Sequence, residues 1–300
     1  MTGSILESNR AAGSRLELLL FNLGGRQLFG INVFKVQEVI PYKTLTQLPG
    51  AHPLVNGVAT LRGITMSVID LSRAIGGPTM EKPKDGIIII TEYNRSVHGF
   101  LVQGVDRIVY TQWEDVQPPP AALGAHSFAT AITTIDNQLV EILDVEKVLD
   151  SIVHASTDIS DSVSDKAHQN SHKVLIVDDS MVARKQIVRA LEQVNIECIT
   201  ATDGEDTIQL LDKLNAEGNE MRNYFCMIIS DIEMPKMDGY MLTTELRKRP
   251  DFQQTYILLH SSISGEFNHE MVKKTGANQF IQKYCPDELA EAVIAHLGSG

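Results

Sequence analysis

The chain has 300 residues, 43% of them hydrophobic, and a formal net charge of −12 at pH 7. This composition can form two ordinary domains. It argues against a nucleic-acid-binding protein, because such binding relies on Lys and Arg side chains that neutralise phosphates. No apolar run approaches the roughly 20 residues of a membrane helix, and residues 1–14 lack the apolar stretch of a signal peptide. We therefore expect a cytoplasmic protein that does not insert into the membrane.

The first half of the chain consists of short apolar runs joined in pairs by turn residues. This pattern predicts an all-β barrel or sandwich. Helical signals are confined to about residues 33–39 and 145–153. The paired runs cover residues 16–23 and 27–31, 55–61 and 64–69, 87–90 and 97–102, and 128–135 and 138–143.

A polar stretch follows this β-rich region. Residues 154–171 are rich in Ser and Asp and offer few apolar groups to offset the entropy of an ordered chain, so we expect a flexible linker. The predicted division of the chain is a flexible N-terminus (1–14), a β-domain (15–153), the linker (154–171) and a second domain (172–300).

In the second domain, polar side chains follow four successive apolar runs. Asp178 and Asp179 come after the first run, and Asp231, Ser261 and Lys283 come after the next three. Helical stretches separate the runs, which predicts βαβ units and a parallel sheet. Functional groups gather at the carboxyl ends of such strands. Three carboxylates, a hydroxyl and an ammonium in one place suit a magnesium ion and a phosphoryl group.

Each of these residues also has an ordinary interpretation. A strand-end Asp such as Asp178 or Asp238 often only caps a helix or a turn. Lys283 alone would be a solvated loop cation, and Ser261 alone a turn hydroxyl. Chance explains the whole set much less well than it explains any one member.

The second domain resembles a response-regulator receiver domain. The resemblance is carried by residues 177–180 (VDDS), residues 231–239 (DIEMPKMDG), Ser261-Ser262 and Lys283. It implies an α/β doubly wound, flavodoxin-like fold with a parallel five-stranded sheet in the order 2-1-3-4-5. This order is one that the general rule for such folds already gives for a receiver.

The same resemblance assigns roles to the residues at the strand ends. Asp231 would accept a phosphoryl group from a partner histidine kinase. Magnesium would be bound directly by Asp179 and Asp231, through water by Asp178, and by the backbone carbonyl of Glu233. The switch and phosphate-binding residues would be Ser261, Phe280 and Lys283.

Three positions depart from the receiver pattern. Tyr284 stands where Pro usually follows the lysine, so the geometry of the Lys283–Tyr284 peptide stays open. Glu233 places a negative charge two residues after the acceptor, where it would either orient water or repel the anion. His260 occupies a usually apolar position, and we favour a strand histidine with a local partner.

The β-domain resembles the chemotaxis coupling domain (CheW-like). The carrying motifs are residues 29–33 (FGINV), 36–40 (VQEVI), 55–58 (VNGV), 61–63 (LRG) and 68–71 (VIDL). The family fold is a pair of intertwined five-stranded barrels with a hydrophobic groove between them. Thr60 and Ser67 depart from the usual Asn and Pro of this family.

The coupling resemblance places four residues near the surfaces that dock partners, namely Val36, Glu38, Gly57 and Arg62. Ordinary interpretations stay open for each of them: Val36 as core, Gly57 as a β-bulge, and Glu38 and Arg62 as solvated charges.

A coupling domain followed by a receiver is the arrangement of the CheV family. It implies a multidomain, non-enzymatic adaptor at receptor arrays that links the cytoplasmic tips of chemoreceptors to a CheA-type histidine kinase, with magnesium as cofactor and phosphorylation as control. One alternative is a metal-dependent phosphatase that forms an aspartyl phosphate, but such enzymes commonly carry an Asp where this chain has Glu233. Another is a generic receiver fused to an unrelated β-barrel binding module.

Overall fold

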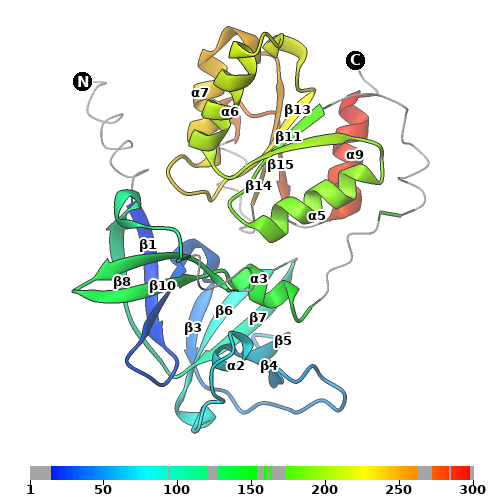
Figure 1. The fold of residues 1–300 in the computed structure, drawn as a ribbon. Coiled ribbons are helices and arrows are strands. Elements are labelled where there is room, and N and C mark those ends of the chain that lie inside the picture. The colour runs from blue at the N-terminus through cyan, green and yellow to red at the C-terminus, as the bar shows by residue number, and fades with distance from the viewer. Residues whose placement is uncertain are drawn as a thin grey trace. The chain divides into compact units, whose positions relative to one another are not determined.

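The computed structural model describes residues 15–93, 95–120, 127–153, 159–160, 163, 173–261, 272–283 and 285–297. The chain falls into two compact units that divide between His154 and Ala155 (Figure 1). Within the described residues, every helix is too short or too polar to cross a membrane.

The first unit contains two five-stranded sheets. One has the strand order β8-β1-β2-β10-β9 and the other β3-β6-β7-β5-β4. The strands are β1 (Arg15–Asn22), β2 (Leu28–Asn32), β3 (Glu38–Pro41), β4 (Val55–Leu61), β5 (Ile64–Asp70), β6 (Ile87–Tyr93), β7 (Ser96–Val102), β8 (Gly104–Gln112), β9 (Ala129–Ile135) and β10 (Gln138–Leu143).

The two sheets share one pattern of strand pairing, although the equivalent strands follow a different order along the chain. Each contains an antiparallel hairpin (β1–β2 or β6–β7) whose first strand pairs with an antiparallel edge strand (β8 or β3). The second strand of that hairpin pairs in parallel with one strand of a further hairpin (β9–β10 or β4–β5). Each sheet therefore repeats one five-strand pattern.

Side-chain contacts join the two edge strands of each sheet. In the first sheet, Thr111 of β8 lies 3.4 Å from Thr133 of β9, and Arg107 pairs with Asp136 in the β9–β10 turn. In the second sheet, Arg62 of the β4–β5 turn bonds Glu38 of β3 at 3.0 Å. Both sheets thus curl so that their edges meet, which confirms the predicted pair of five-stranded barrels.

Strand β1 shows how the apolar pattern builds the cores of this unit. Leu18 and Leu20 belong to the core of their own sheet, whereas Leu19 and Phe21 belong to a core shared with residues of the other sheet. A strand that is buried on both faces has a continuous apolar sequence, as residues 18–21 do.

The four predicted hairpins are confirmed, but the predicted helix at 33–39 is wrong. Only Val33–Lys35 is helical, as the short 3₁₀ helix η1, and Glu38–Pro41 forms strand β3. Val33, Val36 and Val39 recur every three residues and imitate a helix, but pairing of β3 with β6 decides the structure. The unit's other helices are α2 (Leu71–Ala74), α3 (Val145–Asp150), η2 (Pro83–Asp85) and η3 (Trp113–Asp115).

The second unit is a parallel sheet in the order β12-β11-β13-β14-β15, which confirms the predicted order 2-1-3-4-5. One face carries a core that α5 and α9 cover, and the other carries a core that α6 and α7 cover (Figure 1). The elements are β11 (Lys173–Val177), α5 (Met181–Glu192), β12 (Glu197–Ala201), α6 (Gly204–Ala216), η5 (Met221–Asn223), β13 (Met227–Asp231), α7 (Gly239–Lys248), η6 (Pro250–Phe252), β14 (Tyr256–Ser261), β15 (Gln279–Gln282) and α9 (Pro286–Leu297).

Most of the predicted linker and all of the predicted flexible N-terminus lie outside the described residues. Three linker residues are described, and two of them, Ile159 and Val163, belong to the core that α5 and α9 cover.

Candidate functional site

The parallel sheet brings three aspartates together at the carboxyl ends of two adjacent strands. Asp178 and Asp179 follow β11 directly, and Asp231 is the last residue of β13. One carboxylate oxygen from each residue lies within 4.8 Å of those of the other two. Three like charges so close together repel one another, so the cluster needs a positive charge to balance it.

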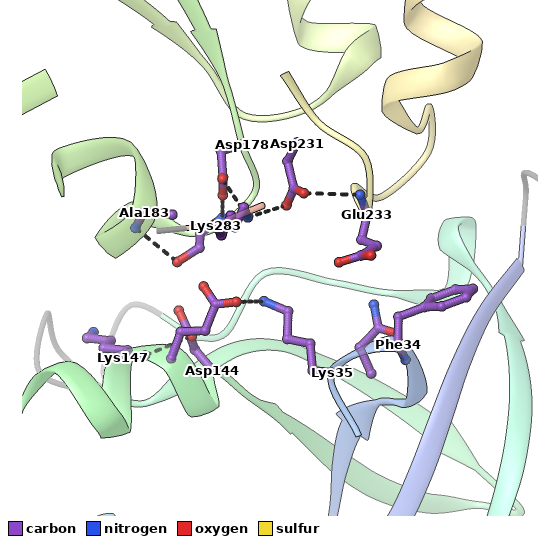
Figure 2. Close-up of polar contacts among 12 residues, drawn as sticks. Phe34, Lys35, Asp144, Lys147, Asp178, Ala183, Asp231, Glu233 and Lys283 are labelled. Carbon is purple, nitrogen blue, oxygen red and sulfur yellow. Dashed lines mark hydrogen bonds and ion pairs between the residues drawn. The ribbon is translucent and has the colours of Figure 1, made fainter. Parts of the chain in front are cut away.

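Lys283 supplies a positive charge to this group. Its Nζ lies 2.8 Å from Oδ2 of Asp178 and 2.7 Å from Oδ2 of Asp231, and it ends between the two carboxylates in Figure 2. Lys283 comes directly after β15, two strands away from β13 in the sheet. Convergence at the strand ends, which the sequence predicts, is therefore what the structure shows.

Local backbone contacts fix the aspartates in place. Oδ1 of Asp178 accepts a hydrogen bond from the Ser180 backbone at 2.8 Å, and Ser180 in turn caps α5. At the other strand, a Cβ on Gly239 would collide with the backbone oxygen of Asp231. Only glycine lets the chain pass so close to the strand end, so Gly239 has a structural role here.

The hydroxyl of Ser261 is bonded to Glu233 and not to Asp231. It donates a 2.6 Å hydrogen bond to Oε1 of Glu233, while the Glu233 backbone N–H lies 3.3 Å from Oδ1 of Asp231. The sequence placed both residues near the acceptor, but it gave no signal for this hydrogen bond between them.

His260 lies beneath the site and is buried. It pairs across the sheet with Asp231, and its Nε2 lies 3.7 Å from Oδ2 of Asp178. This separation is outside hydrogen-bond range. Phe280 is half-buried on β15 and packs against the core that α6 and α7 cover.

Two further titratable groups lie near the loop after Asp231. Burial raises the pKa of Asp238, although backbone N–H groups of Met241 and Tyr240 oppose this effect. Burial, with the nearby charges of Glu233 and Asp238, raises the pKa of Tyr240 to about 12. Asp238 caps α7 by accepting from the Met241 N–H at 2.7 Å, so the helix-cap interpretation applies to this aspartate.

The donor set at the strand ends fits a hard divalent cation. Carboxylate oxygens are the ligands that magnesium prefers in proteins, and it commonly binds through one or two of them together with water and phosphate oxygens. The three aspartates can provide such a set.

The four candidate docking residues of the first unit lie in different environments. Arg62 and Glu38 are brought together, with Arg62 Nη2 3.0 Å from Glu38 Oε1. Gly57 is buried at an irregularity in the β4–β5 pairing, with φ at +141°, and a Cβ there would meet the Thr46 carbonyl. The β-bulge interpretation therefore explains this glycine. Val36 is half-buried against the core shared by the two sheets.

Comparison with known families assigns a class to each unit. The CheW-like domain matches residues 17–153, and the response regulator receiver domain matches residues 174–294. Together with the two barrels and the carboxylate cluster, these matches define the class as a CheW-like domain followed by a receiver domain.

The relatives narrow the class to one family. Chemotaxis protein CheV3 of Helicobacter pylori is 35% identical over 295 residues, which cover 93% of this chain and 94% of that protein. CheV1 of the same species is 27% identical, covering 93% and 92%. Chemotaxis protein CheW of Klebsiella aerogenes is 28% identical over 45% of this chain and 82% of its own length. This chain belongs to the CheV family of chemotaxis proteins.

Proposed function

We propose that this protein is a phosphorylation-regulated coupling adaptor of chemotaxis. Its β-domain (15–153) links the cytoplasmic tips of chemoreceptors to a CheA-type histidine kinase, as part of a receptor array. Its receiver (172–300), joined through residues 154–171, accepts a phosphoryl group from that kinase. The proposal is supported above all by Lys283, which lies within 2.8 Å of both Asp178 and Asp231 in a buried site.

Asp231 is the residue that we assign as the phosphoacceptor. One of its carboxylate oxygens would form the new bond to phosphorus as the bond to the donor histidine nitrogen breaks. Lys283 lies where it can balance the negative charge of the phosphoryl oxygens. Magnesium held by Asp178, Asp179, Asp231 and the Glu233 carbonyl would supply further positive charge for the entering group.

The hydrogen bond between Ser261 and Glu233 opposes the movement of Ser261 toward a phosphoryl group. If Ser261 turns toward a phosphoryl group, it must release the Glu233 carboxylate, to which it donates at 2.6 Å. A hydrogen bond to a charged group contributes about 1.5–3 kcal/mol. Phosphorylation would therefore have to overcome a preference for the resting position of Ser261, and Phe280 would change its rotamer in the same step.

In the β-domain we assign partner docking to the surface that includes Val36, Glu38 and Arg62, with Gly57 shaping the strand beside it. The support is that Glu38 and Arg62 are joined on the protein surface at the place where the two edges of one barrel meet.

The phosphoacceptor assignment is tested by labelling the full chain with a small phosphodonor in the presence of magnesium. Asp231→Asn should abolish the acid-stable, base-labile acyl phosphate, and chelation of magnesium should do the same to the unchanged protein. Asp212→Asn, a change on the exposed face of α6, is the matched control and should label normally. Wild-type labelling of Asp231→Asn would reject the assignment.

The docking assignment is tested by binding of the full chain to a receptor cytoplasmic fragment and to the kinase. Val36→Glu should weaken binding at least about ten-fold, because it places an unpaired charge in an apolar contact. Leu139→Glu introduces the same charge at an exposed apolar position of the other barrel and serves as the control. Labelling of Asp231 should stay normal in both variants, so a variant that loses both activities would indicate misfolding instead.

A further inference from the structure

Two apolar residues in the polar stretch between the domains are buried against the receiver. Ile159 is 8% exposed and Val163 2% exposed. They are four residues apart, and the Val163 N–H donates to the Ser160 carbonyl at 2.9 Å. Both side chains belong to the same core cluster, so they face the same surface.

That surface is the face of the receiver covered by α5 and α9. Ile159 and Val163 belong to the same core as residues of both helices. Burial of two aliphatic side chains favours the attached state, because each removes apolar surface from water. The receiver members of this core that belong to the two helices are Ile187, Ala190, Leu191, Leu289, Ala290 and Val293.

Two backbone hydrogen bonds fix the segment at a defined place on this face. The Ile159 N–H donates to Oε1 of Gln193, the C-cap residue of α5, at 3.1 Å. The Ser160 N–H donates to Oδ1 of Asp287, in the first turn of α9, at 2.8 Å. Two neighbouring amides thus reach one acceptor from each helix, which is a more specific contact than apolar packing alone.

We propose that Ile159, Ser160 and Val163 form an anchor, an interaction motif through which the linker binds the α5–α9 face of its own receiver. The anchor shortens the tether between the domains. Only residues 154–158 then separate Val153 from Ile159, and this length spans at most about 20 Å, whereas a wholly free linker to residue 172 would span up to about 65 Å. A shorter tether keeps the receiver at a higher effective concentration beside the coupling domain and its partners.

The anchor also joins the linker to the helix that follows Lys283. Asp287 lies in the first turn of α9, four residues after Lys283. A movement of Lys283 or of the start of α9 therefore acts directly on the residue that holds the Ser160 amide.

Amide hydrogen exchange of the full chain tests the anchor. The Ile159 and Ser160 amides should exchange at least about ten-fold more slowly than unprotected amides, because both are hydrogen-bonded. Asp287→Ala should remove the protection of Ser160 and leave most of that of Ile159, and it leaves the apolar contact intact. Unprotected exchange of both amides in the unchanged protein would overturn the proposal.

A second pair of variants separates anchoring from tether length. Ile159→Ser with Val163→Ser should release the segment, remove protection at both amides and increase the maximum dimension of the full chain in small-angle X-ray scattering. Ile159→Val with Val163→Ile keeps two aliphatic side chains and should behave as wild type. Retained protection in the double serine variant would reject the apolar contact as the basis of the anchor, and an unchanged maximum dimension despite lost protection would reject the shortened tether.

Discussion

The two domains contain ion pairs of nearly equal length in opposite surroundings. In the receiver, Lys283 lies 2.7 Å from Asp231, and each side chain is 3% exposed. In the coupling domain, Arg62 lies 3.0 Å from Glu38, with 76% of the Arg62 side chain and 32% of the Glu38 side chain exposed. The exposed charges keep most of their hydration, whereas the buried charges have lost theirs and depend on one another.

This difference shows why burial matters more than distance when a charged site is interpreted. A buried cluster of like charges costs stability unless a partner compensates it, so it needs an explanation in function. An exposed pair costs almost nothing to form, and its presence alone indicates little. The receiver site can therefore be argued from its own geometry, while the docking surface depends on measured binding.

The largest effect is expected when the buried cation is removed. Lys283→Met should lower the free energy of unfolding of the receiver by about 3–5 kcal/mol without magnesium, because it leaves Asp178 and Asp231 buried without their positive partner. Chemical unfolding followed by far-ultraviolet circular dichroism measures this change. Added magnesium should restore more stability to the variant than to the wild type. Lys213→Met, an exposed lysine on α6, should change stability little, and equal losses in the two variants would contradict the comparison.

A smaller effect is expected at the hydrogen bond between Ser261 and Glu233. Glu233→Ala should strengthen binding of beryllofluoride, a phosphoryl mimic, because it frees the Ser261 hydroxyl and removes a nearby negative charge. In a Ser261→Ala background the gain should be smaller by about 1–2 kcal/mol, which is the coupling between the two side chains. Isothermal titration calorimetry of the four proteins completes the cycle. An equal gain in both backgrounds would mean that Glu233 acts only through its charge.

The smallest effect on stability is expected at the exposed pair. Arg62→Ala should change the free energy of unfolding of the coupling domain by less than about 1 kcal/mol. The chain has a single tryptophan, Trp113, and it lies in this domain, so its fluorescence follows unfolding there without interference from the receiver. The same variant should still weaken binding of receptor or kinase. A loss of stability as large as that of Lys283→Met would show that the pair supports the fold, and undiminished binding would remove Arg62 from the docking surface.

The sequence predicted best where function and fold impose the same pattern. Asp178, Asp231 and Lys283 each follow an apolar run, and parallel strands can only bring such ends to one edge of the sheet. The four hairpins were equally accessible, since turn residues such as Arg62-Gly63 and Asp136-Asn137 separate runs that pair with each other; all four of these residues have positive φ.

Other features depend on contacts that are distant in sequence. Strand β3 has only four residues and is held by pairing with β6. Strand β8 likewise pairs with β1, which is distant from it in sequence. The hydrogen bond from Ser261 to Glu233 also joins the end of β14 to the loop after β13. The sequence does contain an indication of the contact made by Ile159 and Val163. An i, i+4 apolar pair within a polar stretch indicates a turn whose apolar side packs against another surface.

The order of strands in the two barrels has a consequence for the protein during synthesis. All strands of one barrel, β3 to β7, are contiguous in the chain, so that barrel is complete when Val102 has left the ribosome. The other barrel consists of β1 and β2 together with β8 to β10, and it closes only at Leu143. At about 5–20 residues per second, β1 and β2 wait roughly 5–20 seconds for β10. Throughout that time the face of β1 that carries Leu18 and Leu20 lacks Val140 and Ile142 of its own core, so this strand is open to chaperones and to aggregation.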